Sequence, residues 1–103
     1  MKVYLDDERE TPEGWYRCHW PDQVIKLLKK LCVTHLSLDH DLGDDSKGTG
    51  YDVLLWLEEQ VVTKNFPPPK HITVHSANVS AREKMQKAIN NIDRRAKRYV
   101  VAD

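Results

Sequence analysis

Short runs of apolar or alternating residues are separated along this chain by longer segments with a helical repeat. The short runs lie between turn signals and are typical of β-strands. Four of them cover residues 2–5, 35–38, 71–75 and 99–101, and a weaker run covers residues 15–19. The pattern therefore predicts five strands.

Three longer segments carry apolar residues at the spacing i, i+3, i+4 and i+7, which predicts amphipathic helices. Pro21 suits the first turn of one helix, and Ser80 with Glu83 fits a capping box at the start of another. The inner stripes are Val24, Leu27, Leu28 and Leu31; Val53, Leu54, Leu57 and Val61; and Met85, Ala88, Ile89 and Ile92. Alternating strands and helices predict an α/β fold with a mostly parallel sheet covered on both faces.

One domain, residues 1–103, is the expectation from a length that allows a single core. The formal net charge is zero, so the chain lacks the basic excess of a general polyanion binder. Cys18 and Cys32 show neither metal-ligand spacing nor a disulfide framework. We find no signal peptide and no apolar run of membrane-spanning length, and we expect a cytoplasmic protein without membrane contact.

Acidic residues stand where two of the predicted strands end. Asp6 and Asp7 follow the first strand, and Asp39 and Asp41 follow the strand at 35–38. Parallel strands bring their carboxyl ends to one edge of the sheet, where α/β proteins place their ligands. Two carboxylates about 5 Å apart repel by roughly 3 kcal/mol at an effective dielectric of about 20. These four residues therefore predict a site for Mg²⁺, with Mn²⁺ and Ca²⁺ as alternatives.

Residues at the same edge can also handle phosphate. His40 and His75 can transfer protons near neutral pH, although a structural role is open for each. Ser76 can donate a hydrogen bond to a phosphoryl oxygen, and Asn78 can either contact that ligand or cap the following helix. Ala102 and Asp103 are expected to reach this edge as well.

These motifs together resemble response-regulator receiver domains. Leu5-Asp6-Asp7 resembles their acidic pair, Leu38-Asp39-His40-Asp41 their phosphoacceptor segment, Gly50 their loop glycine, Val74-His75-Ser76-Ala77 their switch segment and Tyr99-Val100-Val101 their last strand. Ala102-Asp103 follow the predicted last strand, where receivers carry a lysine and then a final helix. With His40 and His75 present, it is most similar to the cyclic-phosphate-processing receiver domains.

The resemblance implies a compact three-layer, flavodoxin-like fold. Its five-stranded sheet would have the order 2-1-3-4-5, with the first helix missing or reduced, because residues 8–14 are short and broken by Pro12 and Gly14. It also implies a divalent-metal-dependent phosphoesterase acting on cyclic phosphates of nucleotides or RNA ends. Asp39, His40, His75 and Ser76 would be catalytic, with water or Asp39 as the nucleophile.

Two other functions remain open at this point. A degenerate receiver without turnover would act as a signalling or protein-binding module, and Trp15, Tyr16 and Trp20 would offer it an aromatic contact surface. Asp39-His40-Asp41 also reads as the Asp-x-Asp of Toprim-type nucleic-acid enzymes, but Glu8 lies too far along its loop to supply their glutamate.

Overall fold

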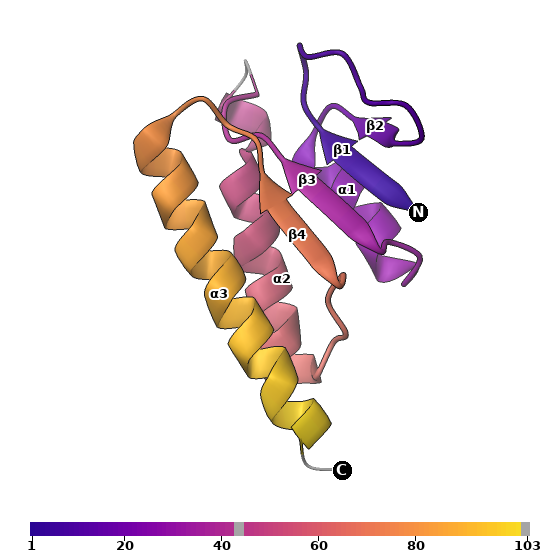
Figure 1. The fold of residues 1–103 in the computed structure, drawn as a ribbon, viewed down its shortest axis with the longest axis vertical. Coiled ribbons are helices and arrows are strands. Elements are labelled where there is room, and N and C mark those ends of the chain that lie inside the picture. Colours follow the sequence, from indigo (N-terminus) through magenta and orange to yellow (C-terminus); the bar gives the residue numbers. More distant parts are fainter. Residues whose placement is uncertain (43–44, 102–103) are drawn as a thin grey trace.

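Four parallel strands form the centre of the computed structural model, which describes residues 1–42 and 45–101. The strands are β1 (Lys2–Leu5), β2 (Tyr16–Cys18), β3 (His35–Leu38) and β4 (His71–Val74). They pair in the order β2-β1-β3-β4 (Figure 1). This order confirms the first four positions of the expected sheet, and residues 6–15 contain no helix, as the resemblance implied.

Three α-helices follow the strands: α1 (Pro21–Lys29), α2 (Gly50–Lys64) and α3 (Val79–Val101), with a short 3-10 helix, η1 (Asp45–Lys47). Side chains satisfy backbone N–H groups at each α-helix start. The Gln23 side-chain oxygen accepts from Trp20 N–H at 3.0 Å, and the Asp52 carboxylate accepts from Thr49 N–H at 2.7 Å. At α3 the cap is Asn78 rather than the predicted Ser80, which lies inside the helix.

The predicted fifth strand at 99–101 is wrong, because α3 continues through Val101. Between Ile92 and Tyr99 the chain has no proline, glycine or other turn signal, and its residues are compatible with a helix. Local propensity therefore extends the helix through residues whose β-branched and aromatic types resemble a strand. Ala102 and Asp103, expected at the edge of the sheet, lie outside the described residues, as does Gly43 in the acidic loop.

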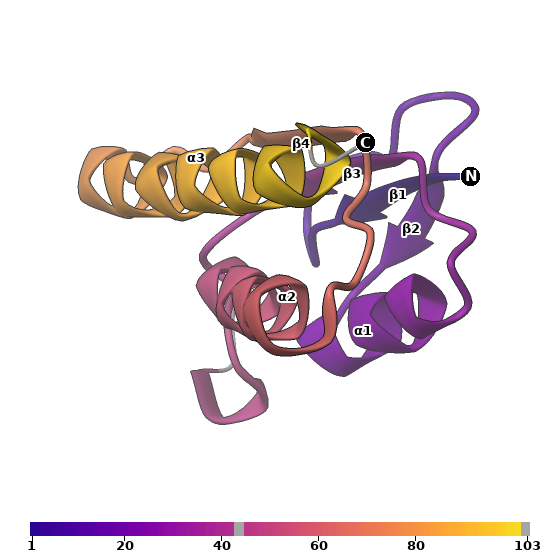
Figure 2. The ribbon, with the colours of Figure 1, turned by 90° about the horizontal axis from the view of Figure 1, so that it is seen from below.

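The predicted three-layer arrangement is also wrong. Helices α1 and α2 lie against one face of the sheet, and α3 runs beside β4 and packs along α2 (Figures 1 and 2). Within residues 1–42 and 45–101, no helix covers the opposite face, which we call the open face. Residues 6–15, between β1 and β2, form no helix that could cover this face.

The hydrophobic core lies between the sheet and the helices. Val3, Leu5, Leu36 and Leu38 point into it from β1 and β3 and are inaccessible to solvent. The predicted helix stripes supply the other side, including Val24, Leu28, Val53, Leu54, Leu57, Val61, Met85, Ile89 and Ile92. None of the described helices combines the length and the hydropathy that a membrane crossing requires.

Candidate functional site

Asp6, Asp39 and His75 directly follow β1, β3 and β4, and they stand side by side. The hydrogen-bond ladder of the sheet continues through them. Asp39 N–H donates to the Leu5 carbonyl, and His75 N–H to the Leu38 carbonyl, each at 3.0 Å. Residues paired across parallel strands point to the same side of a sheet. The three side chains therefore meet at the carboxyl edge of the open face.

The three side chains form the potential metal-binding group found among the described residues. Each offers one ligand atom, and these atoms lie within 4.8 Å of one another. Asp6 is fully buried, Asp39 is 7% exposed and His75 is half-buried. Two carboxylates and an imidazole suit Mn²⁺, Fe²⁺ or Zn²⁺ as well as Mg²⁺, because imidazole nitrogen favours the transition metals.

His75 is held from three sides. Its Nε2 lies 3.1 Å from Asp6 Oδ2, and its Nδ1 lies 2.7 Å from Ser37 Oγ. Its ring stacks on Tyr4 with a centroid separation of 4.2 Å and an interplanar angle of 2°. Because the Asp6 carboxylate only accepts hydrogen bonds, the neutral ring carries its proton on Nε2, and the Ser37 hydroxyl donates to Nδ1.

The two buried carboxylates are in opposite electrostatic situations. Burial alone would raise the pKa of Asp6, but hydrogen bonds from Arg9 and Glu8 and the neighbouring His75 hold that pKa below its ordinary value. Burial raises the pKa of Asp39, and the Asp6 charge adds to this effect. Burial also lowers the pKa of His75, outweighing the attraction of both carboxylates. The Asp39 charge is therefore the less well compensated one.

Arg9 supplies the positive charge nearest to these carboxylates. Its Nη1 lies 3.0 Å from Asp6 Oδ2 and 3.5 Å from Asp39 Oδ2, while 43% of its side chain is exposed. The Arg9 and Glu8 N–H groups also donate to Asp6 Oδ1, at 2.9 and 2.8 Å. A hollow of about 210 Å³ opens here, lined by Asp6, Glu8, Arg9, Asp39, Asp41 and Ala77.

The other two predicted metal ligands, Asp7 and Asp41, lie outside this group of three. Asp7 is half-buried and is not among the close ligand atoms. Asp41 is exposed, and its Oδ1 lies 2.8 Å from His40 Nδ1, so its carboxylate orients that imidazole. The His40 N–H donates to Asp39 Oδ1 at 2.8 Å.

Ser76 and Asn78 are occupied in forming the start of α3. The Ser76 hydroxyl is 2% exposed and accepts a hydrogen bond from Asn78 N–H at 3.1 Å. Asn78 Oδ1 accepts from Ala81 N–H at 3.1 Å, so of its two expected roles the structure displays the helix cap. Ala77 lines the acidic hollow, and Ser76 is not among its lining residues.

Tyr4, Arg9 and Ser37 belong to the site but were not predicted. Strand alternation is a signal for two of them, because Tyr4 and Ser37 stand two residues before Asp6 and Asp39 and share their face. Arg9 lies on an irregular loop, where no periodicity predicts its direction.

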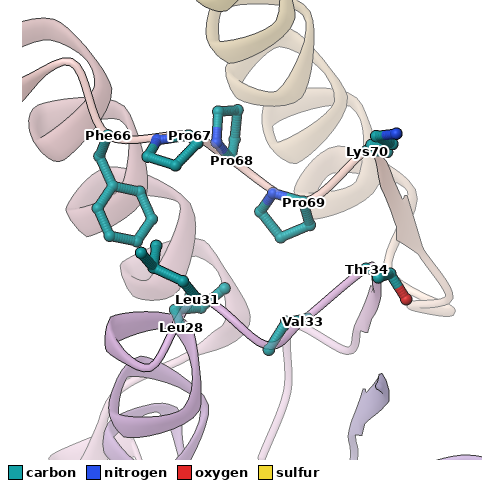
Figure 3. Close-up of a pocket in the computed structure, with 9 residues that line it drawn as sticks. All are labelled: Leu28, Leu31, Val33, Thr34, Phe66, Pro67, Pro68, Pro69 and Lys70. Carbon is teal, nitrogen blue, oxygen red and sulfur yellow. The ribbon is translucent and has the colours of Figure 1, made fainter.

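A second hollow lies at the other end of the strands (Figure 3). It has a volume of about 230 Å³ and is lined by Leu28, Leu31, Val33, Thr34, Phe66, Pro67, Pro68, Pro69 and Lys70. Figure 3 shows the Phe66 ring directed towards Leu31. Its lining contains no carboxylate, imidazole or thiol, so it lacks the chemistry of the acidic hollow.

The expected aromatic surface is divided by the sheet. Trp15 contacts Tyr4 and His35 edge to face at centroid distances of 6.2 Å, on the open face. Trp20 packs against the core cluster and lies under Lys47, whose Nζ is 4.6 Å from its ring centroid. The two tryptophans therefore do not form one continuous patch.

Comparison with known proteins agrees with this geometry. A family model described as the cyclic-phosphate processing receiver domain matches residues 1–91, which include all four strands and every residue of the acidic site. No curated protein and no solved structure matches the chain. The match covers most of the sequence, and the chain belongs to the cyclic-phosphate processing receiver domain family.

Proposed function

We propose that this protein is a divalent-metal-dependent phosphoesterase that hydrolyses cyclic phosphates of nucleotides or RNA ends. The observation that carries the proposal is the convergence of Asp6, Asp39 and His75 within 4.8 Å at the carboxyl edge of a parallel sheet. Membership of the family supports the cyclic-phosphate substrate class.

Asp6, Asp39 and His75 would hold the cation, and Asp41 lines the same hollow. A bound divalent ion polarises phosphoryl oxygens and offsets their charge. If His75 binds through Nε2, its proton moves to Nδ1 and the Ser37 hydroxyl accepts that hydrogen bond instead of donating one. The 2.7 Å contact between Ser37 and His75 serves both tautomers.

Arg9 would change partners when the site is loaded. In the metal-free protein its guanidinium is the counter-charge of Asp6 and Asp39. A cation on the same oxygens makes that pairing redundant, and the exposed arm of Arg9 leaves it free to bind phosphate oxygens at the mouth of the hollow. Arg9 would thus supply a positive charge to the bound phosphate from the loop that follows β1.

Hydrolysis of a cyclic phosphodiester consumes one water. The water oxygen bonds to phosphorus, one P–O ester bond breaks, and the leaving oxygen takes a proton. His40, oriented by Asp41 at 2.8 Å, is the residue placed to move that proton at the rim of the site. Attack by Asp39 instead would form an aspartyl phosphate that water then hydrolyses. Borohydride reduction of a trapped aspartyl phosphate, which would convert Asp39 to homoserine, would identify this second route.

Thermal melts with and without Mg²⁺ or Mn²⁺ test the metal site, and a panel of 2′,3′-cyclic nucleotides tests turnover. We expect the cation to raise the melting temperature of the wild type, because it binds the native state alone. Asp39→Asn should abolish that shift, whereas the matched change Asp7→Asn, one residue outside the close group, should retain most of it. An unchanged shift in Asp39→Asn would refute the site, and metal binding without turnover of any cyclic phosphate would refute the enzyme.

A binding module without turnover is the second candidate. The observation that favours it is that Arg9 already pairs with both carboxylates, its Nη1 lying 3.0 Å from Asp6 Oδ2 and 3.5 Å from Asp39 Oδ2. Beryllofluoride or acetyl phosphate that altered the surface around Trp15, with no hydrolysis of cyclic phosphates, would support this module over the enzyme.

A further inference from the structure

The open face carries a row of rings and a cation. Lys2 pairs with His35, and His35 with His71, so their side chains share one side of the sheet. The His35 and His71 rings stack at a centroid distance of 4.4 Å, and Trp15 meets His35 edge to face at 6.2 Å. Lys2 Nζ lies 5.8 Å from the Trp15 centroid. We call Trp15, His35 and His71 the ring row.

An uncovered face is unusual for this kind of sheet, because all-parallel sheets normally bury both faces. Here the open face is made of polar and aromatic groups instead of aliphatic ones. The next row across the strands consists of Tyr4, Arg17, Ser37 and Thr73. His71 and Thr73 are exposed, and Trp15, Arg17 and His35 are half-buried.

The charges on this face favour an anionic ligand. Within β1 to β4, the side chains on the open face include Lys2 and Arg17 and no carboxylate. The carboxylates begin just beyond the strand ends, at Asp6 and Asp39, where the metal is proposed. His35 is also mainly neutral near pH 7, because desolvation and the neighbouring His71 and Lys2 lower its pKa.

The ring row and the acidic site belong to the same face at different heights along the strands. His35 and Asp39 are four residues apart, which corresponds to roughly 13 Å along an extended strand. Tyr4, which pairs with Ser37 and stacks on His75 of the acidic site, lies between them along the strands. A ligand that touches both ends must therefore be longer than a single nucleotide.

We infer that the open face binds the bases of a single-stranded nucleic acid whose terminal phosphate reaches Asp6, Asp39 and His75. Bases stack on the ring row, with exposed His71 as the first contact, and Lys2 and Arg17 pair with the backbone phosphates. The part of the inference that concerns the terminal phosphate rests on the proposed function. The base-binding part stands on the ring row and the charge of this face.

Stacking on planar side chains is worth about 1–3 kcal/mol per base and tolerates any sequence. A protein partner would instead require an apolar, tightly packed centre at its interface. The open face offers no exposed aliphatic side chain on β1, β3 or β4, since Leu5, Leu36, Leu38 and Val74 belong to the other face. The ligand that fits this surface is therefore a nucleic acid strand.

The test measures binding of a six-nucleotide oligouridylate with a 3′-hydroxyl end, in EDTA and at low salt, by titration calorimetry. Neither metal nor turnover is needed. We expect binding that weakens as salt rises. His71→Ala should weaken it at least about 5-fold, the equivalent of about 1 kcal/mol. Lys2→Gln should weaken it less and reduce the salt dependence.

The matched control is Tyr16→Ala, which removes a 55%-exposed aromatic ring whose strand position pairs with Val3 on the helix side. That variant should bind the oligonucleotide like the wild type. Absence of binding, or equal affinity of His71→Ala and wild type, would overturn the inference. A dimer in analytical ultracentrifugation that dissociates in His71→Ala would also overturn it, by making the ring row a contact between two copies.

Failure of this inference and failure of the proposed function give different results. If cyclic mononucleotides are hydrolysed and the oligonucleotide does not bind, the base-binding face is refuted and the enzyme stands. If the oligonucleotide binds through His71 and no cyclic phosphate is hydrolysed, the base-binding face stands and the enzyme is refuted.

Discussion

The two faces of the sheet are built from the same strands and differ in almost every physical property. Leu36 and Ser37 are neighbours in β3, yet Leu36 is sealed in the core and Ser37 donates to a histidine of the acidic site. On β1, β3 and β4 the helix-covered face consists of aliphatic side chains, whereas the open face consists of rings, hydroxyls and charges. Strand alternation thus separates the residues that stabilise the fold from those available for chemistry.

The difference also appears in the electrostatics. The helix-covered face buries apolar groups, which gains free energy on folding. At the edge of the open face, folding instead buries Asp39 beside Asp6, and the pKa of Asp39 rises as a result. The apolar groups of the helix-covered face therefore stabilise the fold, whereas the buried Asp39 charge opposes it, and the following variants test this contrast.

The largest effect is expected on the helix-covered face. Leu36→Ala should lower the free energy of unfolding by about 2–5 kcal/mol, because it removes buried methyl groups and leaves a cavity. The neighbouring change Ser37→Ala removes only the hydrogen bond to His75 and should cost about 1 kcal/mol. Urea denaturation of both variants measures this difference. Equal losses would show that the open face contributes to the core as much as the helix side does.

Gly50→Ala should disturb the connection between the two faces. An added Cβ would collide with the Asp39 carbonyl oxygen and lie 3.0 Å from Met85 Cε, in the core. We expect a loss of roughly 1–3 kcal/mol from overpacking, together with a smaller metal-induced shift in melting temperature because Asp39 is displaced. Glu59→Ala, at an exposed position of the same helix, is the control. A stable variant with an unchanged metal shift would contradict this close packing.

The carboxylates of the site were predictable because strand ends are visible in the sequence. Asp6 and Asp39 each close an apolar run, and parallel pairing brings such ends together. The place of Arg9 in the site was not predictable, since the direction of its side chain depends on hydrogen bonds made by an irregular loop. His75 was predicted, but strand alternation alone did not establish that its side chain, unlike that of Ser76, stands beside Asp6 and Asp39.

The wrong prediction of a fifth strand has a local origin. A full sheet with two covered faces needs a fifth strand and further helices, and the residue types at 99–101 resembled that strand. Their neighbours in sequence are helix formers without a turn signal, and the helix continues through them.

Asp39→Asn should stabilise the metal-free protein, in contrast to the core variants. Removing one of two neighbouring buried charges relieves the repulsion that raises the pKa of Asp39. We expect a gain of about 1 kcal/mol, which corresponds to a rise of roughly 4–8 °C in melting temperature for a domain of this size. The measurement is a melt in EDTA. A lower melting temperature would mean that Arg9 already compensates both carboxylates completely.

Lowering the pH should reduce the free energy of unfolding of the metal-free protein, because His75 becomes protonated. Burial lowers the folded-state pKa of His75, so the unfolded chain binds more protons once the pH falls below about 6.5. This contribution is fully present above that pH and is lost as the pH falls towards the lower folded-state pKa. Unfolding free energies in EDTA between pH 7.5 and 5 should therefore decrease, and the decrease should be shallower in His75→Gln. Identical slopes would exclude His75 as the source.

The smallest effect on stability is expected from the ring row. His71 is exposed on the edge strand and contributes nothing to the core, so His71→Ala should change the free energy of unfolding by no more than about 0.5 kcal/mol. Urea denaturation beside Leu36→Ala checks this value. A loss of unfolding free energy comparable to that of Leu36→Ala would mean that the ring row stabilises the sheet. A negligible loss combined with weaker oligonucleotide binding would mean that the open face is retained for a ligand, since stability alone would then give no reason to keep a ring at this position.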